Sequence, residues 1–167
     1  MTTTVPTTTH DAATSGRPGW RTWTTAGLAA LTAYSAGVGW QAQLVSYPLY
    51  RAVGAEEFAA YHLQYNDSIP LVVIAPGFAA FLGGVAFWWT RPAGVPRWAA
   101  GVVAVGGLTS ALTTALWAIP MHDRLDKVGR SAETIDSLVL ANVPRTVALT
   151  LSTGVLLWVL ARGTRER

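Results

Sequence analysis

The sequence contains no cysteine, and only 13% of its 167 residues are charged. Without cysteine the chain can form no disulfide, thiolate nucleophile or cysteine-ligated metal site. A soluble domain usually carries about 25% charged residues, so the low charge argues against an ordinary water-soluble domain. The sequence also lacks internal repeats and a glycine-rich phosphate-binding motif, and we expect no nucleic-acid partner.

Long apolar runs are abundant instead, since hydrophobic residues make up 51% of the chain. Two uncharged runs, 69–89 and 98–121, have the roughly 20 residues that cross a hydrocarbon core. A further helix fits near 25–46, between Arg21 and Arg51. The length of the chain leaves room for one domain. These runs predict an all-α integral membrane protein.

The last apolar run, 146–161, is too short to cross a membrane by itself. As a helix its 16 residues extend about 24 Å, against a core of roughly 30 Å. A crossing helix must therefore begin near residue 138 and include Asn142 and Arg145. The sequence thus predicts a membrane four-helix bundle with spans at about 25–46, 69–89, 98–121 and 138–161.

Cationic residues differ between the two sides of these four spans. One side has Arg17, Arg21, Arg91, Arg97, Arg162, Arg165 and Arg167, and the other has Arg51, Arg124, Lys127 and Arg130. The more cationic side should be cytoplasmic, which places both termini in the cytoplasm and the protein in the cytoplasmic membrane. Residues 1–19 are threonine-rich and lack the apolar core of a secretory signal. We expect them to form a disordered cytosolic tail, followed by a transmembrane domain at 20–162 and a short tail at 163–167.

Further helical structure is expected in the outer connections. Residues 55–66 predict a short extra helix in the first outer connection. The second connection should turn at Gly129 and restart with Ser131 as the N-cap of a helix that continues through Pro144 into the last span. One stripe of residues spaced by four in the first span favours close helix packing. Its members are Ala29, Ala33, Gly37 and Gln41.

The predicted topology gathers polar residues from all four spans at the extracytoplasmic end. The candidate site residues there are His62, His122, Asn142 and Arg145, with Gln41, Tyr50, Asn66 and Arg124 beside them. A charge in the middle of a bilayer costs at least ~2.5–3.5 kcal/mol, so Arg145 should face a partner or a wet cavity. Asn142 lies one turn away, and Asp67 and Asp123 are candidate counter-ions. The cluster predicts a pocket at one end of the bundle.

Structural roles are the alternative interpretation of the same residues. Arg145 would then extend to the outer lipid headgroups, and His122 and Arg124 would be interfacial residues at a helix end. His62 would be a structural histidine. A metal held by His62 and His122 with an aspartate is chemically allowed, but no histidine pair has the usual ligand spacing along a helix. We therefore predict no cofactor.

Short motifs in this outer region resemble those of a known family. They are YPLY at 47–50, EFAAYH at 57–62, PMHDRL at 120–125 and NVPRT at 142–146. Set in four membrane helices over residues 25–161, they resemble the anthrone-oxygenase-like family of small membrane proteins, many of which are catalogued as a domain of unknown function. His122 stands where that family often has asparagine, and Leu138 stands where tryptophan is common.

The resemblance implies cofactor-independent oxidation by dioxygen of an electron-rich polycyclic phenol, such as anthrone to anthraquinone. His62 or His122 would deprotonate the phenol or a benzylic C–H, and Arg145 and Asn142 would stabilise the resulting oxyanion. A flat lipophilic substrate would enter from the membrane lipid.

Two other functions fit the sequence. One is a noncatalytic small membrane subunit whose outer polar cluster binds a partner or lipid. The other is a transport or quinone-binding site. Transport usually needs polar residues that continue across the midplane. The inner halves of the second and fourth spans are almost purely apolar, which favours a one-sided pocket over a conduit.

Overall fold

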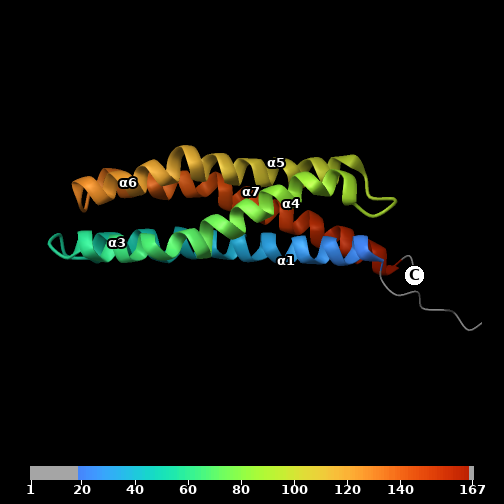
Figure 1. Ribbon diagram of the computed structural model, residues 1–167, viewed down its shortest axis with the longest axis horizontal. Helices are drawn as coiled ribbons and strands as arrows, with labels where there is room; N and C mark the ends of the chain where they lie inside the picture. The colour runs from blue at the N-terminus through green and yellow to red at the C-terminus, as the bar shows by residue number, and fades with distance from the viewer. Residues whose placement is uncertain (1–18, 166–167) are drawn as a thin grey trace, which may run out of the picture.

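The computed structural model of the protein describes residues 19–165, which form an all-α bundle without a strand among them (Figure 1). The first helical run comprises α1 (Trp20–Gln41), η1 (Ala42–Ser46), α2 (Tyr47–Leu49) and η2 (Tyr50–Ala52). The second comprises α3 (Phe58–Ile69), η3 (Pro70–Ile74) and α4 (Ala75–Thr90). The third comprises α5 (Arg97–Thr113), η4 (Thr114–Ala118) and α6 (Ile119–Val128), and α7 (Ala132–Arg165) is the fourth. The elements η1, η3 and η4 are π-helical turns.

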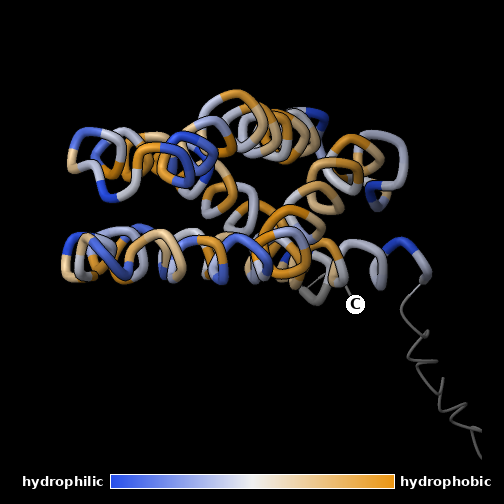
Figure 2. The backbone as a smooth tube through the Cα atoms, turned by 60° about the vertical axis from the view of Figure 1, so that its left-hand side comes forward, coloured by the Kyte–Doolittle hydropathy of each residue, from blue (hydrophilic) through white to orange (hydrophobic). Residues whose placement is uncertain are grey.

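The four runs alternate in direction along an elongated bundle. The start of α1, the connection between α4 and α5, and the end of α7 lie at one end, while α3 and α6 lie at the other (Figure 1). Helix α7 packs along both α1 and α5, and α4 packs against α5 and α1. Hydrophilic segments gather where α3 and α6 lie (Figure 2). We call this the polar end of the bundle.

Three helices are long and apolar enough to cross a membrane, and they indicate an integral membrane protein. They are Phe58–Thr90, Arg97–Val128 and Ala132–Gly163. The three corresponding spans predicted from the sequence each fall within one of these longer helices. Helix α1 has 22 residues and packs along α7, but it is not among the three helices that combine the length with the apolar composition.

The short extra helix predicted at 55–66 is not a separate element. Helix α3 begins at Phe58 and continues through η3 into α4 without a break. The connection before α7 follows the prediction more closely. Gly129 adopts a φ of 74°, and the Thr134 backbone N–H donates to Ser131 Oγ over 3.3 Å. Helix α7 then continues through Pro144.

The unbroken helices depend on a pairing of π-helical turns with prolines. Each π-helical turn is followed two residues later by a proline, at Pro48, Pro76 and Pro120. A proline lacks the N–H donor, and its ring crowds the carbonyl four residues earlier. That carbonyl lies inside the π-helical turn in each case. Because a π-helical turn bonds to the fifth residue instead of the fourth, it accommodates the proline without ending the helix.

The packing face of α1 differs from the predicted small-residue stripe. Ala33 and Gly37 are exposed, and space around Gly37 is open to at least 4 Å. The buried face instead carries Thr25, Leu28, Ala29, Thr32, Ser35, Ala36 and Gly39. Spacing by four identifies a face of a helix, but which face meets the neighbours depends on how the helix is rotated in the bundle.

Helices α4 and α5 approach closely at glycines. A Cβ added to Gly107 would lie 2.8 Å from the Phe81 Cα atom, and one added to Gly84 would lie 2.9 Å from the Val103 carbonyl oxygen. Both neighbours are backbone atoms, which cannot rotate away. The two helices can therefore pack at this distance only with glycine at these positions.

Substitution of Gly107 by alanine is expected to destabilise the bundle by about 1–3 kcal/mol because it overpacks the contact between α4 and α5. The measurement is thermal unfolding in detergent, with Gly37→Ala as the matched control. Gly37 lies in open space on α1. The control should therefore match or slightly exceed the wild-type stability, since alanine is the better helix former by about 0.8–1 kcal/mol. Equal melting temperatures for the two variants would contradict this packing.

Candidate functional site

Two histidines from different helices meet at the polar end. His62 lies on α3 and His122 on α6, and His62 Nε2 is 3.0 Å from His122 Nδ1. The two rings are stacked with an interplanar angle of 20°. The His62 residue is fully buried and His122 is 8% exposed. The structure therefore brings together the two histidines that the sequence analysis assigned to one site.

Hydrogen bonds extend this pair in both directions. His62 Nδ1 lies 2.6 Å from Asp126 Oδ1, and the Asn66 amide nitrogen donates to Asp126 Oδ2 over 2.8 Å. On the other side the Tyr47 hydroxyl lies 3.5 Å from His122 Nε2. Tyr47 follows the end of the first apolar run, and burial raises its pKa to about 12, so its phenol keeps its proton. We call Tyr47, His122, His62 and Asp126 the polar chain.

The chain of partners sets the tautomers of both imidazoles. The Asp126 carboxylate accepts the Nδ1 proton of His62, which leaves His62 Nε2 as an acceptor. His122 Nδ1 then donates to that acceptor, and the remaining nitrogen, His122 Nε2, is unprotonated, with the Tyr47 hydroxyl 3.5 Å away. An unprotonated imidazole nitrogen is the property that a general base needs.

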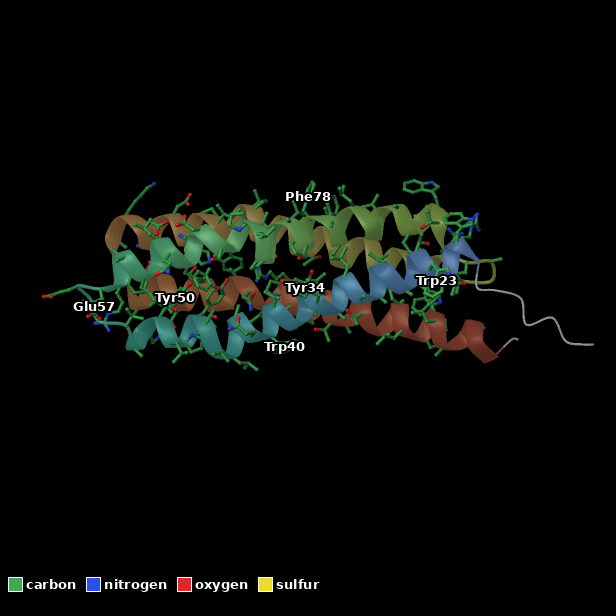
Figure 3. The ribbon with its side chains drawn as sticks, turned by 60° about the horizontal axis from the view of Figure 1, so that its bottom comes forward. Trp23, Tyr34, Trp40, Tyr50, Glu57 and Phe78 are labelled. Carbon is green, nitrogen blue, oxygen red and sulfur yellow. The ribbon has the colours of Figure 1, made fainter. Side chains whose placement is uncertain are left out.

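Aromatic rings hold the histidine pair in place. Phe58 and Tyr65 are stacked on the His62 ring at angles of 14° and 18°, and Tyr50 meets its edge at 81°. Tyr50 is fully buried near the polar end (Figure 3). Tyr50 therefore supports the site by packing, and it does not line either of the two cavities described next.

An apolar cavity of about 250 Å³ lies in the middle of the bundle. Its walls come from α1, η3, α4, α5, η4, α6 and α7, and they include Ser35, Val73, Phe78, Leu112, Ala115 and Arg145. Several of these side chains are also exposed on the outside, with Phe78 54% and Leu112 47% exposed. Phe78 projects from the outer side of the bundle in Figure 3. The cavity is thus bounded on one side by residues that also face the surroundings of the bundle.

A smaller hollow of about 20 Å³ lies beside this cavity and is lined by Tyr47 and His122 of the polar chain. Arg145, Thr114 and Val73 line both spaces. The hollow adds Tyr47 and His122, which the large cavity does not reach. His122 is therefore the histidine that a molecule in the cavity approaches, whereas the buried His62 lies behind it.

Arg145 is a buried cation that pairs with no carboxylate in the part of the chain that the structure describes. It is only 5% exposed, and its Nη1 contacts Thr114 Oγ1 at 3.4 Å. Within residues 19–165 the ion pairs are Arg51 with Asp136 and His62 with Asp126, so no acid neutralises this guanidinium. Removing a cation from water without an anion costs several kcal/mol. Arg145 therefore lies buried at the wall of the cavity, and among residues 19–165 no negative charge is paired with it.

The two carboxylates that the sequence suggested as counter-ions lie elsewhere. Asp67 and Asp123 are both exposed. Each directly follows an inward-facing residue, Asn66 or His122, and one residue along an α-helix turns the side chain by about 100°. The inward face of α6 therefore carries Asp126, four residues after His122, and turns Asp123 outward.

The remaining candidate residues have separate contacts. The Asn142 amide nitrogen donates to the Gly39 carbonyl and to Gln43 Oε1, over 2.9 Å and 2.8 Å, and so joins α7 to α1. Gln41 is exposed and pairs with Ser46, and Arg124 is exposed. Neither of these two residues lines the cavity or the hollow.

Sequence reasoning missed Asp126 as a site residue. The signal was a spacing of four that occurs twice, in His62 with Asn66 and in His122 with Asp126, because residues four apart share a helix face. It also missed Ser35, whose buried hydroxyl oxygen lines the cavity without a hydrogen-bond partner. Within the described part of the chain no three histidine or acidic side chains are placed to hold a metal ion.

Comparison of the chain with known protein families, with curated proteins and with solved structures found no match.

Proposed function

We propose that the protein is a membrane enzyme that binds a lipophilic, weakly acidic aromatic compound in the apolar cavity, deprotonates it and oxidises the anion with dioxygen. One observation carries this proposal. The uncompensated Arg145 cation lies where the apolar cavity meets His122. A ligand that matches both features has an apolar body and a group that becomes negative. The motifs that resemble the anthrone-oxygenase-like family point to the same class of substrate.

The cavity favours entry of the substrate from the lipid. Its walls are largely apolar, and Phe78 and Leu112 are shared between the cavity and the outer surface. A flat polycyclic phenol partitions into a bilayer, so it would reach the cavity from the side and would not need to cross the polar end. The Ser35 hydroxyl offers a hydrogen bond to a polar group on the body of the ligand.

The first chemical step is a proton transfer to His122 Nε2. His122 lines the hollow, and its Nε2 is unprotonated because His122 Nδ1 carries the proton that is donated to His62. The Tyr47 hydroxyl, 3.5 Å away, gives up its contact with Nε2 when the substrate proton arrives. Negative charge then develops on the oxygen of the substrate, where Arg145 stabilises it. Such a fixed donor is most effective in a low-dielectric site, from which water is excluded.

The oxidation balances with dioxygen as the only oxidant. The substrate carbanion bonds to one oxygen atom of dioxygen and gives a peroxide anion, which recovers one proton and becomes a hydroperoxide. Loss of the second benzylic proton breaks the O–O bond and releases hydroxide, which takes up that proton as water. The sum converts CH₂ and O₂ into C=O and H₂O.

The orientation in the membrane is part of the proposal. Helix α1 would cross as a fourth span beside α7 and α4. The polar end would be extracytoplasmic and both termini cytoplasmic, because the arginines at 21, 91, 97 and 162 lie at the opposite end. The substrate would then be oxidised near the outer interface.

The direct test is to incubate membranes that contain the protein with anthrone under air and to follow anthraquinone and oxygen. We expect one O₂ consumed per anthraquinone formed, at a rate above that of membranes without the protein. Binding of anthrone without oxygen consumption would contradict the enzyme and support a noncatalytic lipid- or quinone-binding protein. Absence of binding would contradict both functions.

A further inference from the structure

We propose that Asp126, with Asn66, is the outer terminus of a proton relay that carries the substrate proton from His122 through His62 to water at the polar end. This inference rests on the proposed function and adds to it the route of the proton. It assigns Asp126 a role as a relay residue that does not touch the substrate.

The geometry of the polar chain is continuous. His122 Nδ1 and His62 Nε2 are 3.0 Å apart, and His62 Nδ1 and Asp126 Oδ1 are 2.6 Å apart. The first distance is within the normal hydrogen-bond range, and the second is a short hydrogen bond to a carboxylate. Exposure rises at the end of the chain, because the His62 side chain is completely buried and the Asp126 side chain is 26% exposed. Asp126 is therefore the point at which the chain meets water.

The proton transfer along this chain is balanced. When His122 Nε2 takes the substrate proton, the proton on His122 Nδ1 moves to His62 Nε2. The proton on His62 Nδ1 then moves to Asp126. Both imidazoles end neutral in the opposite tautomer, and the carboxylate ends as a carboxylic acid. The reverse sequence delivers a proton to the peroxide anion and restores the original tautomers.

The charges around the histidines favour transfer of the proton to Asp126 over its retention on His122. Arg145 lines the hollow beside His122, so a proton kept on His122 would put a second cation next to an uncompensated one. The other titratable groups that face the pair are phenols. They are Tyr47, Tyr50 and Tyr65. Among residues 19–165, Asp126 is the one acid paired with either imidazole, and it is therefore the acceptor at the end of the route.

Anaerobic hydrogen exchange tests the relay separately from the oxidation. In D₂O without oxygen, the enzyme should remove a benzylic proton of anthrone and return a deuteron, which mass spectrometry detects. The deuteron enters only if the proton reaches water before it returns. We expect wild-type protein to exchange anthrone faster than the detergent background.

Substitution of Asp126 by asparagine keeps a hydrogen-bond acceptor for His62 but removes the group that takes the proton. We expect exchange to fall at least about tenfold, within the range for loss of one proton-transfer group, while the Kd for anthrone stays within about twofold. The Asp126→Glu variant retains the carboxylate and should recover most of the exchange. Asp136→Asn is the matched control, since Asp136 is an exposed acid paired with Arg51, and its exchange should equal that of the wild type.

The possible failures are distinguishable. If the Asp126→Asn variant exchanged anthrone as fast as the wild type, the relay would be overturned and the proposed function would remain intact. An Asp126→Glu variant as slow as Asp126→Asn, with anthrone still bound, would also overturn it. Wild-type protein that neither exchanges nor oxidises anthrone would contradict the proposed function itself.

Discussion

Replacement of His122 by glutamine is expected to lower the rate of anthrone oxidation about 10²–10⁴-fold, the usual contribution of a general base. His122 lines the hollow, and its Nε2 is unprotonated because Nδ1 donates to His62. Glutamine is of similar size and can still donate to His62, but it cannot accept a proton at neutral pH. We expect the loss in kcat, with KM nearly unchanged, because the cavity that holds the substrate is lined by other residues.

The matched control for His122 is its neighbour. Asp123→Asn changes the charge of an exposed residue on the same turn of α6 and should leave oxidation unchanged. Oxygen-electrode assays of purified protein measure both variants. If the His122→Gln variant oxidised anthrone as fast as the wild type, His122 would be excluded as the base. A fall in Asp123→Asn of the same size would attribute the effect to distortion of α6.

Replacement of Arg145 by methionine is expected to have two opposite effects. Oxidation should fall about 10²–10³-fold, as it does when one donor to a developing oxyanion is removed. Stability should rise, because methionine has a similar length and removes a buried cation that no carboxylate among residues 19–165 neutralises. Each kcal/mol gained should raise the melting temperature in detergent by about 2–4 °C.

Two further variants separate charge from shape. Arg145→Lys retains the positive charge but not the planar fork of donors, so it should recover only part of the activity. Lys127→Met removes an exposed cation from α6 and should change neither activity nor stability. A melting temperature that falls in Arg145→Met would mean that Arg145 stabilises the fold through contacts of its own. The guanidinium would then serve the fold, and not the binding of an anion.

Much of the fold could be predicted from the sequence, because the signals are local. Uncharged runs longer than the hydrocarbon core indicate membrane helices wherever they occur. The N-cap at Ser131 and the turn at Gly129 depend on residues within one helical turn. The shortness of 146–161 also correctly required α7 to include Arg145, since that conclusion needs only the rise per residue.

The predictions that proved wrong concern features that the local sequence pattern of one helix does not determine. Whether Asp123 or Asp126 faces His62 depends on how α6 is rotated against α3, and a difference of three residues decides it. The continuity of α3 into α4 depends on η3, a π-helical turn for which the sequence offers only the neighbouring proline as a sign. The same limit applies to the packing face of α1.

In the proposed site the cavity holds its ligand as an anion against Arg145. A lipophilic nitrophenol is a chromophoric, non-oxidisable analogue, and its absorbance reports its ionisation when it is titrated with pH in the presence of the protein. We expect its pKa in the wild-type protein to lie about 1–3 units below its value in protein-free micelles, because an opposite charge nearby favours the anion. In Arg145→Met the shift should disappear. If the bound nitrophenol had the same pKa in the wild-type protein as in micelles, Arg145 would not stabilise a bound anion.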